Sequence, residues 1–251
     1  MLPDRLARMK RLATAWADLL RWLGKPLGVL LVISALGLGL ATLLGWGFAE
    51  LYESVVAGTG VAGFDVPILE AMVAHRTVAS AAAVTWFTQT AGPIGMPILG
   101  TVATVLAALH ARRITPVILT VVAGAGSLAM TIAVKGLVGR DRPPLIEAVP
   151  PYESSASFPS GHSLNALVII GIVVYSLVLT LKTRWAKVLT IVVGTTYALA
   201  VGLSRVYLGH HWLSDVIGAW LLGLAWLLVV IVAHRIARSY AAREKPALPP
   251  V

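Results

Sequence analysis

Residues 158–181 read FPSGHSLNALVIIGIVVYSLVLTL, in which a polar knot is followed at once by an apolar run. The hydrocarbon core of a bilayer is about 30 Å thick and needs roughly 20 apolar residues in helical form. The segment 162–181 meets that length, so we expect it to cross a membrane. The span itself does not explain why Ser160, Gly161 and His162 stand at its start.

Composition along the whole chain indicates the same class of protein. The 251 residues are 58% hydrophobic with a mean hydropathy of +0.85, which is more apolar surface than a soluble core of this size hides. The first apolar run is too long for a typical signal peptide, and we expect it to be retained. We therefore predict an all-α, polytopic membrane protein with six transmembrane helices, at 27–48, 91–109, 117–138, 162–181, 188–204 and 214–233.

Lys and Arg residues are distributed unevenly over the predicted loops. The net charge is +9, and if the N-terminus is cytoplasmic, fifteen of the 20 Lys and Arg residues lie on the inner side. This bias is the positive-inside signature of a membrane protein, helped by attraction to anionic headgroups. We expect membrane lipids and no nucleic acid as partners, and both termini in the cytoplasm. The chain length suits a bacterial inner (cytoplasmic) membrane.

Three regions are expected along the chain. Residues 1–25 are basic and amphipathic, suited to a helix on the inner membrane surface, with a disordered leader as the alternative. Residues 26–235 form the six-span domain, and 236–251 are expected to be a disordered cytoplasmic tail. Within the domain, residues 50–90 are too polar to cross, and DVPILEAMVAH at 65–75 opens like a capped amphipathic helix. We expect 50–90 to be a lid-like helical segment at the outer interface.

The unusual polar residues gather in two loops, 139–161 and 205–213. With six spans, both loops fall on the outer, extracytoplasmic side, whereas the inner connections HARRIT and KTRWAK are short and basic. That outer face is therefore the expected working side.

Cations at the outer span ends suggest an anion as ligand, because charges at such places are costly and usually functional. Lys135 precedes Arg142 by seven residues, about two helical turns, so both can share one face if the helix persists until Pro143. The alternative is that Lys135 snorkels to the interface while Arg140 and Arg142 are solvated.

The polar knot at 160–162 fits the same ligand. Ser160 is a good N-cap, Gly161 lets the backbone approach a ligand, and a helix N-terminus offers free N–H groups to an anion. His162 in that first turn is placed to give a proton to a departing oxygen. Alternatively, Ser160 is only a cap and His162 an interfacial polar residue.

A third element, SRVYLGHHWLSD at 204–215, adds an imidazole–carboxylate pair. If the segment from His211 is helical, Asp215 at i+4 can bond one ring nitrogen and leave the other as a nucleophile or a base. His210 has only Ser214 in the same register and is the weaker candidate. Arg205 suits bidentate contact with phosphate oxygens.

Metal chemistry is the competing interpretation, since His162, His210, His211 and Asp215 are possible zinc ligands. The chain has no cysteine, which excludes thiolate sites and disulfides. Clustered Lys and Arg residues repel a divalent ion but neutralise a phosphoryl group. We therefore favour phosphoryl transfer with no metal and no cofactor.

Taken together, the motifs resemble the type 2 phosphatidic acid phosphatase (PAP2) superfamily. Its patterns K-x6-RP, PSGH and SR-x5-H-x3-D read here as KGLVGRDRP at 135–143, PSGH at 159–162 and SRVYLGHHWLSD at 204–215. Every motif position matches, in order, although the resemblance covers only about residues 135–215.

The resemblance implies a role for each motif residue. His211 attacks phosphorus, Asp215 orients it, and His162 protonates the leaving oxygen, without a metal. Outside the motifs, Arg140 offers an additional outward cation for a second phosphate, with a solvated side chain as the equal alternative. The residues implied to bind phosphate are Lys135, Arg142, Pro143, Ser160, Gly161 and Arg205.

A site at span ends is expected to take its substrate laterally from the lipid leaflet. Our first choice is a polyprenyl (undecaprenyl-type) diphosphate, hydrolysed to the monophosphate. The alternatives are phosphatidylglycerophosphate or phosphatidate as substrate, or a lipid phosphotransferase using the same residues. A vanadium haloperoxidase is disfavoured because those relatives are soluble. The sequence leaves the oligomeric state open.

Overall fold

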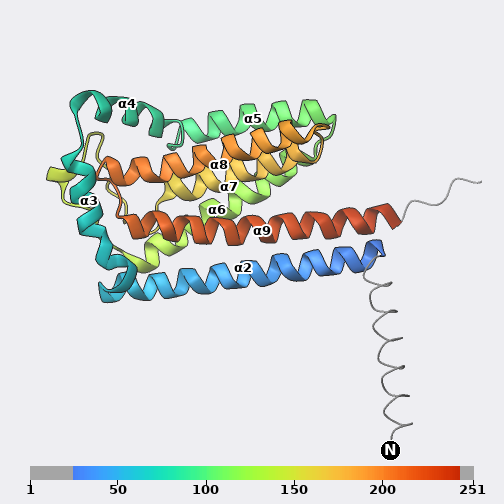
Figure 1. The fold of residues 1–251 in the computed structure, drawn as a ribbon, viewed down its shortest axis with the longest axis horizontal. Helices are drawn as coiled ribbons and strands as arrows, with labels where there is room; N and C mark the ends of the chain where they lie inside the picture. Colours follow the sequence, from blue (N-terminus) through green and yellow to red (C-terminus); the bar gives the residue numbers. More distant parts are fainter. Residues whose placement is uncertain (1–24, 244–251) are drawn as a thin grey trace, which may run out of the picture.

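The computed structural model describes residues 25–243, and every regular element within that part of the chain is helical (Figure 1). The expected all-helical fold is therefore confirmed. In chain order the elements are α2 (Pro26–Ala57), η1 (Gly60–Phe64), α3 (Asp65–Ala74), α4 (Val78–Gln89), α5 (Gly95–Ala111), α6 (Thr115–Val138), η2 (Leu145–Glu147), α7 (Gly161–Val178), α8 (Arg184–Tyr207) and α9 (Leu213–Arg243).

Five helices are long and apolar enough to cross a membrane, namely α2, α6, α7, α8 and α9. The sixth expected span, 91–109, corresponds to α5, which is apolar but has only 17 residues. At 1.5 Å per residue α5 is about 25 Å long, somewhat shorter than a typical hydrocarbon core. The structure thus supports a multi-pass membrane protein with five candidate spans and one shorter apolar helix.

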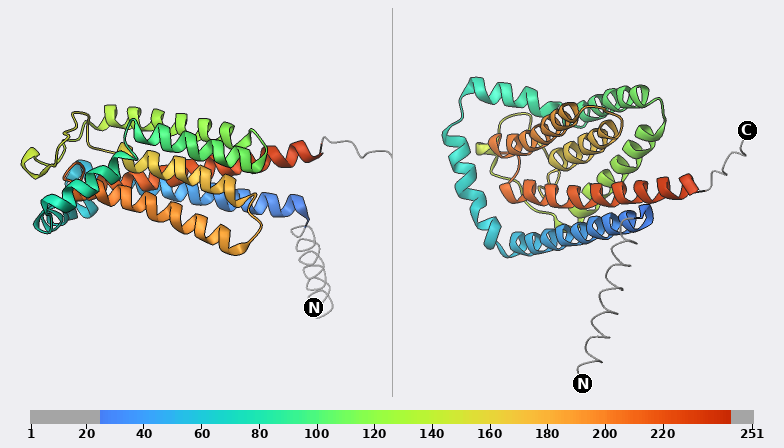
Figure 2. Two further views of the ribbon diagram at one scale, coloured as in Figure 1. Left: turned by 90° about the horizontal axis from the view of Figure 1, so that it is seen from above. Right: turned by 45° about the vertical axis from the view of Figure 1, so that its right-hand side comes forward.

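Helix α7 forms the centre of the bundle and packs against α5, α6, α8 and α9. Its residues Leu164, Val168 and Ile172 are completely buried, and they meet Ala219 and Leu227 of α9. Helix α2 lies outside this group along α9, as the right-hand view of Figure 2 shows. Apolar side chains on the other helices remain exposed, as expected where lipid is the solvent.

Close helix contacts depend on small residues. A Cβ atom at Gly126 would lie 2.3 Å from the ring of Trp226, whose indole N–H donates to the carbonyl of Ala123 at 2.9 Å. The absence of a side chain at this position therefore lets α6 and α9 approach closely, a common device between membrane helices.

The segment between the first two apolar helices crosses one end of the bundle. Helix α2 continues to Ala57, beyond the expected start of the lid-like segment at residue 50. Helix α3 then passes over the end of the bundle, and α4 leads back to α5 (Figure 1). Residues 58–90 are thus largely helical, and a lid function for them stays a prediction.

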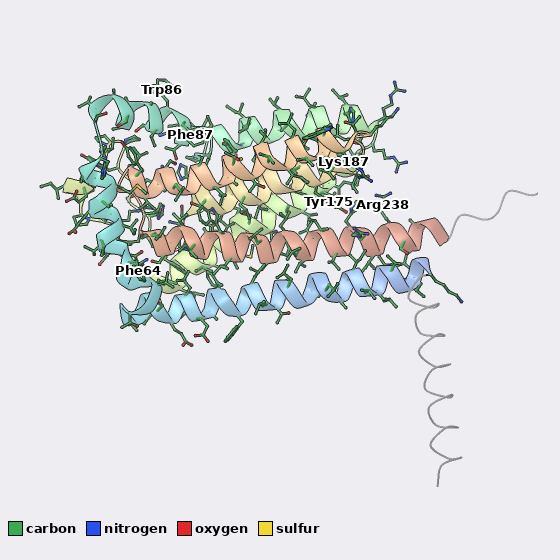
Figure 3. All side chains as sticks on the ribbon, in the orientation of Figure 1. Phe64, Trp86, Phe87, Tyr175, Lys187 and Arg238 are labelled. Atoms are coloured by element: carbon green, nitrogen blue, oxygen red, sulfur yellow. The ribbon has the colours of Figure 1, made fainter. Side chains whose placement is uncertain are left out.

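At the opposite end the described part of the chain begins and ends, and Lys187 and Arg238 lie there, whereas Phe64 lies at the end crossed by α3 (Figure 3). Helix α9 continues through Arg243, so the boundary expected at residue 235 falls inside a helix, and residues 236–243 are helical where a disordered tail was expected. The predicted amphipathic segment 1–25, apart from Lys25, and the last residues of the predicted tail lie outside the described residues.

Candidate active site

Helix α6 ends at Val138, four residues before Arg142. Gly139 adopts the left-handed conformation (φ 59°), and its N–H donates to the carbonyl of Lys135, which terminates the helix. The condition for a shared helical face, a helix that persists until Pro143, is therefore not met, and Lys135 and Arg142 do not share one. Pro143 is buried in the loop that follows.

Lys135 and Arg142 nevertheless converge, because both bind the loop before α7. The Lys135 ammonium donates to Ser155 Oγ at 3.2 Å and to the carbonyl of Ala156. The Arg142 guanidinium donates to the Ser155 carbonyl at 2.7 Å and to Ser155 Oγ at 3.0 Å. The loop, and not the helix, brings the two cations together.

The predicted start of α7 is confirmed by its N-cap. Ser160 is fully buried, and its Oγ accepts from the N–H of Ser163 at 3.4 Å and from its hydroxyl at 2.8 Å. Gly161 and His162 form the first turn and line a cavity at the helix end. Gly161 and His162 thus face that cavity, while the Ser160 oxygen is engaged in capping.

His211 and Asp215 are in contact. Nδ1 of His211 lies 3.2 Å from Oδ2 of Asp215, and Nε2 lies 3.2 Å from Nη1 of Arg142. The His211 side chain is buried, and this burial, together with the charges of Arg142 and Arg205, holds its pKa well below the usual value. His211 is therefore neutral at neutral pH, with Nδ1 toward the carboxylate and Nε2 toward the cations.

Its sequence neighbour His210 has different partners. Nε2 of His210 lies 2.6 Å from the carbonyl oxygen of Val149, so this ring ties two loops together. Burial, and secondarily the charge of Arg205, lowers the pKa of His210 to about 4. The weaker pairing considered with Ser214 is not formed, because the Ser214 hydroxyl bonds Asp65 and Arg140 instead.

Arg205 is the most deeply placed cation. It lies near the end of α8 with 1% of its surface exposed, and Nη1 donates to Thr88 Oγ1 at 3.3 Å. Nη2 donates to the carboxylate of Glu153. A buried guanidinium requires such compensation, since an unpaired charge in this environment is strongly destabilising.

Glu153 was not singled out from the sequence, yet its carboxylate occupies the middle of the cation cluster. Its Oε2 lies 2.8 Å from Nη2 of Arg142, and Oε1 contacts Arg205. The ring nitrogens His162 Nδ1 and His211 Nε2 lie 3.8 and 3.9 Å away from its oxygens. Burial alone would raise the pKa of Glu153, but the charge of Arg205 and its neighbours outweighs burial and lowers it to about 2. A single acid in a loop carries no sequence signal for this position.

Arg140 does not join the other cations. Its Nη1 donates to Asp215 Oδ1 at 2.5 Å and to Ser214 Oγ at 2.7 Å, and its Nη2 donates to Asp65 Oδ2 at 2.7 Å. The second-phosphate contact expected for Arg140 does not fit this geometry, because the guanidinium is committed to two carboxylates.

A cavity of about 480 Å³ opens beside the cluster between α5, α6 and α7. Lys135, Glu153 and His162 line its polar end. Its other walls are mainly apolar and come from residues that include Met96, Pro97, Gly100, Leu128 and Ile169. One cavity therefore has charged residues of the cluster at one end and mainly apolar walls elsewhere.

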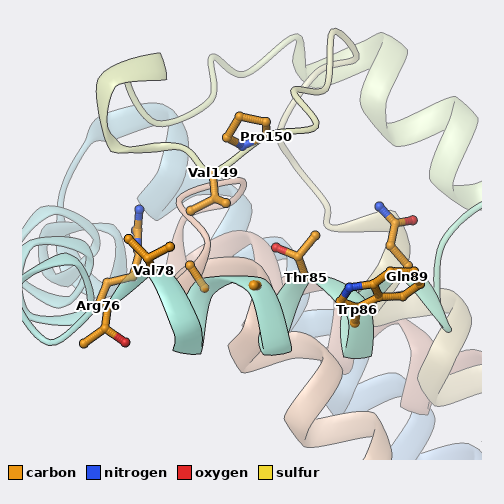
Figure 4. A pocket seen from close by; sticks show the side chains of 10 residues that line it. Arg76, Val78, Thr85, Trp86, Gln89, Val149 and Pro150 are labelled. Carbon is orange, nitrogen blue, oxygen red and sulfur yellow. The ribbon is translucent and has the colours of Figure 1, made fainter.

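A second cavity, of about 720 Å³, lies between α4 and the loop after η2 (Figure 4). Arg76, Thr85, Trp86 and Gln89 line it from the helix side, and Val149 and Pro150 face them. None of the motif residues lines this cavity, so it lies beside the site and not within it.

The possible zinc ligands predicted from the sequence, His162, His210, His211 and Asp215, belong to this same region. Within residues 25–243, no group of three or more His, Asp or Glu side chains is arranged to hold a metal ion. That the reaction proceeds without a metal stays a prediction, which rests on the positive charge of the cluster.

Comparisons with known proteins cover different parts of the chain. The family model described as PAP2 superfamily matches residues 115–238. Phosphatidylglycerophosphatase B of Bacillus subtilis (strain 168) is 42% identical over 98 residues, which are 38% of this chain and 47% of that protein. Undecaprenyl-diphosphatase of Sulfolobus acidocaldarius is 43% identical over 77 residues, 31% of this chain and 32% of that protein. The chain thus spans less than half the length of each of these relatives.

A solved structure extends the likeness beyond the motifs. The crystal structure of a transmembrane PAP2 type phosphatidylglycerolphosphate phosphatase from Bacillus subtilis matches with a TM-score of 0.69 and 25% sequence identity. The match covers 83% of this chain and 98% of that one, so it extends well beyond residues 115–238.

Proposed function

We propose, on the premise that residues 115–238 belong to the PAP2 superfamily, that this protein is a membrane lipid phosphatase. The observation that carries the proposal is the orientation of His211. Its Nε2 lies 3.2 Å from Arg142 and faces the same carboxylate that Arg205 binds. A nucleophile is thereby directed at an anion held by guanidinium groups.

Glu153 indicates where the phosphoryl group binds. A carboxylate and a phosphoryl group share geometry toward a guanidinium fork, so the position of Glu153 approximates that of the substrate oxygens. Phosphate binding then requires the Glu153 carboxylate to move out of the cluster. Arg142, Arg205 and Lys135 then bind the phosphate oxygens of the substrate in place of their present partners. These cations stabilise the charge that develops on the equatorial oxygens.

The adjoining cavity supports a lipid as the carrier of the phosphate. Lys135 and His162 lie at its polar end, and its wall continues along apolar residues of three helices that would face or adjoin lipid. A phosphate at the polar end and an acyl or prenyl chain along the apolar wall match this arrangement.

The proposed reaction has two steps. The Nε2 lone pair of His211 attacks phosphorus while the P–O bond to the leaving group breaks, and protonated His162 gives its proton to the departing oxygen. Asp215 holds the Nδ1 proton of His211 throughout. A water molecule then gives a proton to His162 and attacks phosphorus, so the P–N bond of the phosphohistidine breaks and orthophosphate leaves.

Two substrate classes are distinguished by specific observations. A polyprenyl diphosphate, our first choice from the sequence, agrees with the undecaprenyl-diphosphatase relative. Phosphatidylglycerophosphate is favoured by the solved structure and by the longer match to phosphatidylglycerophosphatase B. Arg140 pairs with Asp65 and Asp215, so the contact that we expected it to make with the second phosphate of a diphosphate is not available. The diphosphate therefore has no advantage at the site, and both lipids remain candidate substrates.

The proposed topology places α5 as a sixth span in a bacterial inner membrane, with cytoplasmic termini and the site at the extracytoplasmic face. Lys182, Arg184 and Lys187 lie between α7 and α8 or in the first turn of α8, at the end away from α3. The positive-inside rule assigns that end to the cytoplasm.

Phosphate release tests the proposal. Purified protein in detergent is given polyprenyl diphosphate, phosphatidylglycerophosphate or phosphatidate, with and without EDTA. We expect release from at least one of these lipids, with EDTA changing the rate by less than about twofold, because guanidinium groups supply the positive charge. No release from any of them would refute a phosphatase, and a rate restored only by added zinc or magnesium would refute the metal-free mechanism. Mass analysis of the products separates hydrolysis from transfer to another lipid.

A further inference from the structure

A buried carboxylate from outside the family segment reaches the site. Asp65 is the first residue of α3, and only 3% of its surface is exposed. The sequence suggested a cap for its own helix, but the N-cap of α3 is Phe64, and the Asp65 carboxylate bonds α9 and Arg140 instead. It lies 149 positions from Ser214 along the chain.

One function of this carboxylate is to cap α9. Trp212 immediately precedes the helix and has no side-chain oxygen with which to accept a hydrogen bond from the first turn. Asp65 Oδ1 accepts from the N–H of Ser214 at 2.8 Å, and Oδ2 accepts from its hydroxyl at 2.6 Å. A distant residue thus supplies what a local cap usually supplies.

Its second contact leads to the nucleophile. The two terminal nitrogens of Arg140 are divided between Asp65 at 2.7 Å and Asp215 at 2.5 Å. The Arg140 guanidinium donates to Oδ1 of Asp215. The other oxygen, Oδ2, accepts from the Trp212 N–H and from the Ser157 hydroxyl, and it faces Nδ1 of His211. Each oxygen of Asp215 therefore has a separate task.

We propose that Asp65 is a positioning residue for the nucleophile, acting through Arg140 and Ser214 to hold Asp215 against His211. The inference rests on the proposed function of His211 and adds a residue that no motif contains. It also gives α3 a role in the chemistry, because the segment that crosses the bundle end supplies one support of the reacting group.

Loss of the Asp65 carboxylate should affect turnover through Arg140. Both nitrogens of Arg140 become free to bind Asp215 as a fork, which draws Oδ2 away from His211. Within residues 25–243 the Asp65 carboxylate bonds Arg140 and Ser214 but not Lys135, Arg142 or Arg205, so these three cations keep their partners. Turnover should fall while substrate binding is retained.

The test compares Asp65→Asn with the wild type in detergent, using the most active lipid of the panel above. A misplacement of about 1 Å costs on the order of 100-fold in rate, so we expect kcat to fall about 10- to 100-fold. KM and the inhibition constant of inorganic phosphate should stay within about twofold, since both report on the cations proposed to bind phosphate and not on the orientation of the nucleophile. Glu70→Gln, on the exposed side of the same helix, is the matched control and should behave as the wild type.

A double variant tests the route through Arg140. If Asp65 acts through that side chain, Asp65→Asn combined with Arg140→Gln should be about as slow as Arg140→Gln alone. Ser214→Ala removes the hydroxyl from the same network and should lower kcat in the same direction, which keeps the proposal testable if Asp65→Asn does not fold.

Each outcome bears on a different claim. Undiminished kcat in Asp65→Asn overturns the inference while leaving the phosphatase intact. Equal losses in kcat and in phosphate binding also overturn it, because they indicate collapse of the whole site. Fully additive losses in the double variant overturn it as well, because additivity indicates that Asp65 and Arg140 act independently. An inactive wild type on every lipid overturns the proposed function and, with it, this inference.

Discussion

At the end of the bundle crossed by α3, the side chains of Arg140, Arg142 and Arg205 are 16%, 13% and 1% exposed, and each contacts a carboxylate. At the opposite end Arg113, Lys182 and Arg184 are exposed. All eight acidic residues between positions 25 and 243 lie at or beside the α3 end. The buried cations paired with carboxylates are the ones that we propose bind phosphate, whereas the exposed cations are the ones that the positive-inside rule assigns to the cytoplasmic side.

The largest expected effect separates the histidines of the two ends. His211→Ala should lower turnover by at least about 10⁴-fold, because loss of a covalent nucleophile removes the reaction path. Initial rates of phosphate release measure the loss, and thermal unfolding in detergent checks folding. His110→Ala, exposed at the opposite end, is the control and should stay within about twofold. Equal effects of the two substitutions would contradict the assignment of catalysis to the α3 end of the bundle.

A smaller effect is expected for the cations. Arg142→Gln should lower kcat/KM by about 10²- to 10³-fold, the usual consequence of removing one donor to a developing charge. Arg184→Gln changes the same kind of side chain at the other end, where it is exposed, and should leave kcat/KM unchanged. A loss below about threefold in Arg142→Gln would show that its contact with Glu153 is only structural.

Substitution of Glu153 tests the role of the carboxylate at the α3 end, because this side chain pairs with Arg142 and Arg205 when no substrate is bound. Glu153→Gln should tighten vanadate inhibition by about tenfold, because the anion no longer competes with an ionised side chain. With a pKa of about 2, Glu153 stays ionised at any working pH, so acidification to pH 5 should not mimic the substitution. Weaker vanadate binding would instead indicate that Glu153 organises the cations for the ligand.

The smallest effect concerns stability and pH. The folded pKa of His210, about 4, lies below the ordinary value near 6.5, so the unfolded chain binds more protons between these values. Stability should therefore decrease as the pH falls from about 6.5 toward 4. The thermal midpoint of His210→Asn should decrease less between pH 7 and pH 4.5 than that of the wild type. The exposed His110→Asn should show the full wild-type decrease, and identical curves for all three would contradict this assignment.

Several features of the site could be predicted because they depend on neighbours in the chain. Ser160 caps α7 since its side chain needs only the N–H three residues ahead. The His211–Asp215 contact similarly requires only four residues of compact backbone. The helical class and the apolar spans follow from run length, which a bilayer imposes directly.

Other features escaped prediction because they depend on remote partners. The α6 helix ends at Gly139 and not at Pro143, since a glycine in the left-handed conformation closes the helix before proline is reached. Arg140 and Arg142 are separated by a single residue in the sequence. Arg140 nevertheless binds Asp65 and Asp215, while Arg142 binds Glu153. Which carboxylate a long side chain reaches depends on how loops and α3 pack, and spacing contains no record of that.

The sequence by itself determined the membrane class, the motifs and the side of the bundle on which they gather, because hydrophobic length, charge asymmetry and short-range capping act locally. Only the tertiary structure decided that Glu153 lies among the cations proposed to bind phosphate, and that Asp65, from a helix before the family segment, is joined to Asp215 through Arg140. Buried charges need partners within a few ångströms, and such partners are selected by packing across the whole bundle.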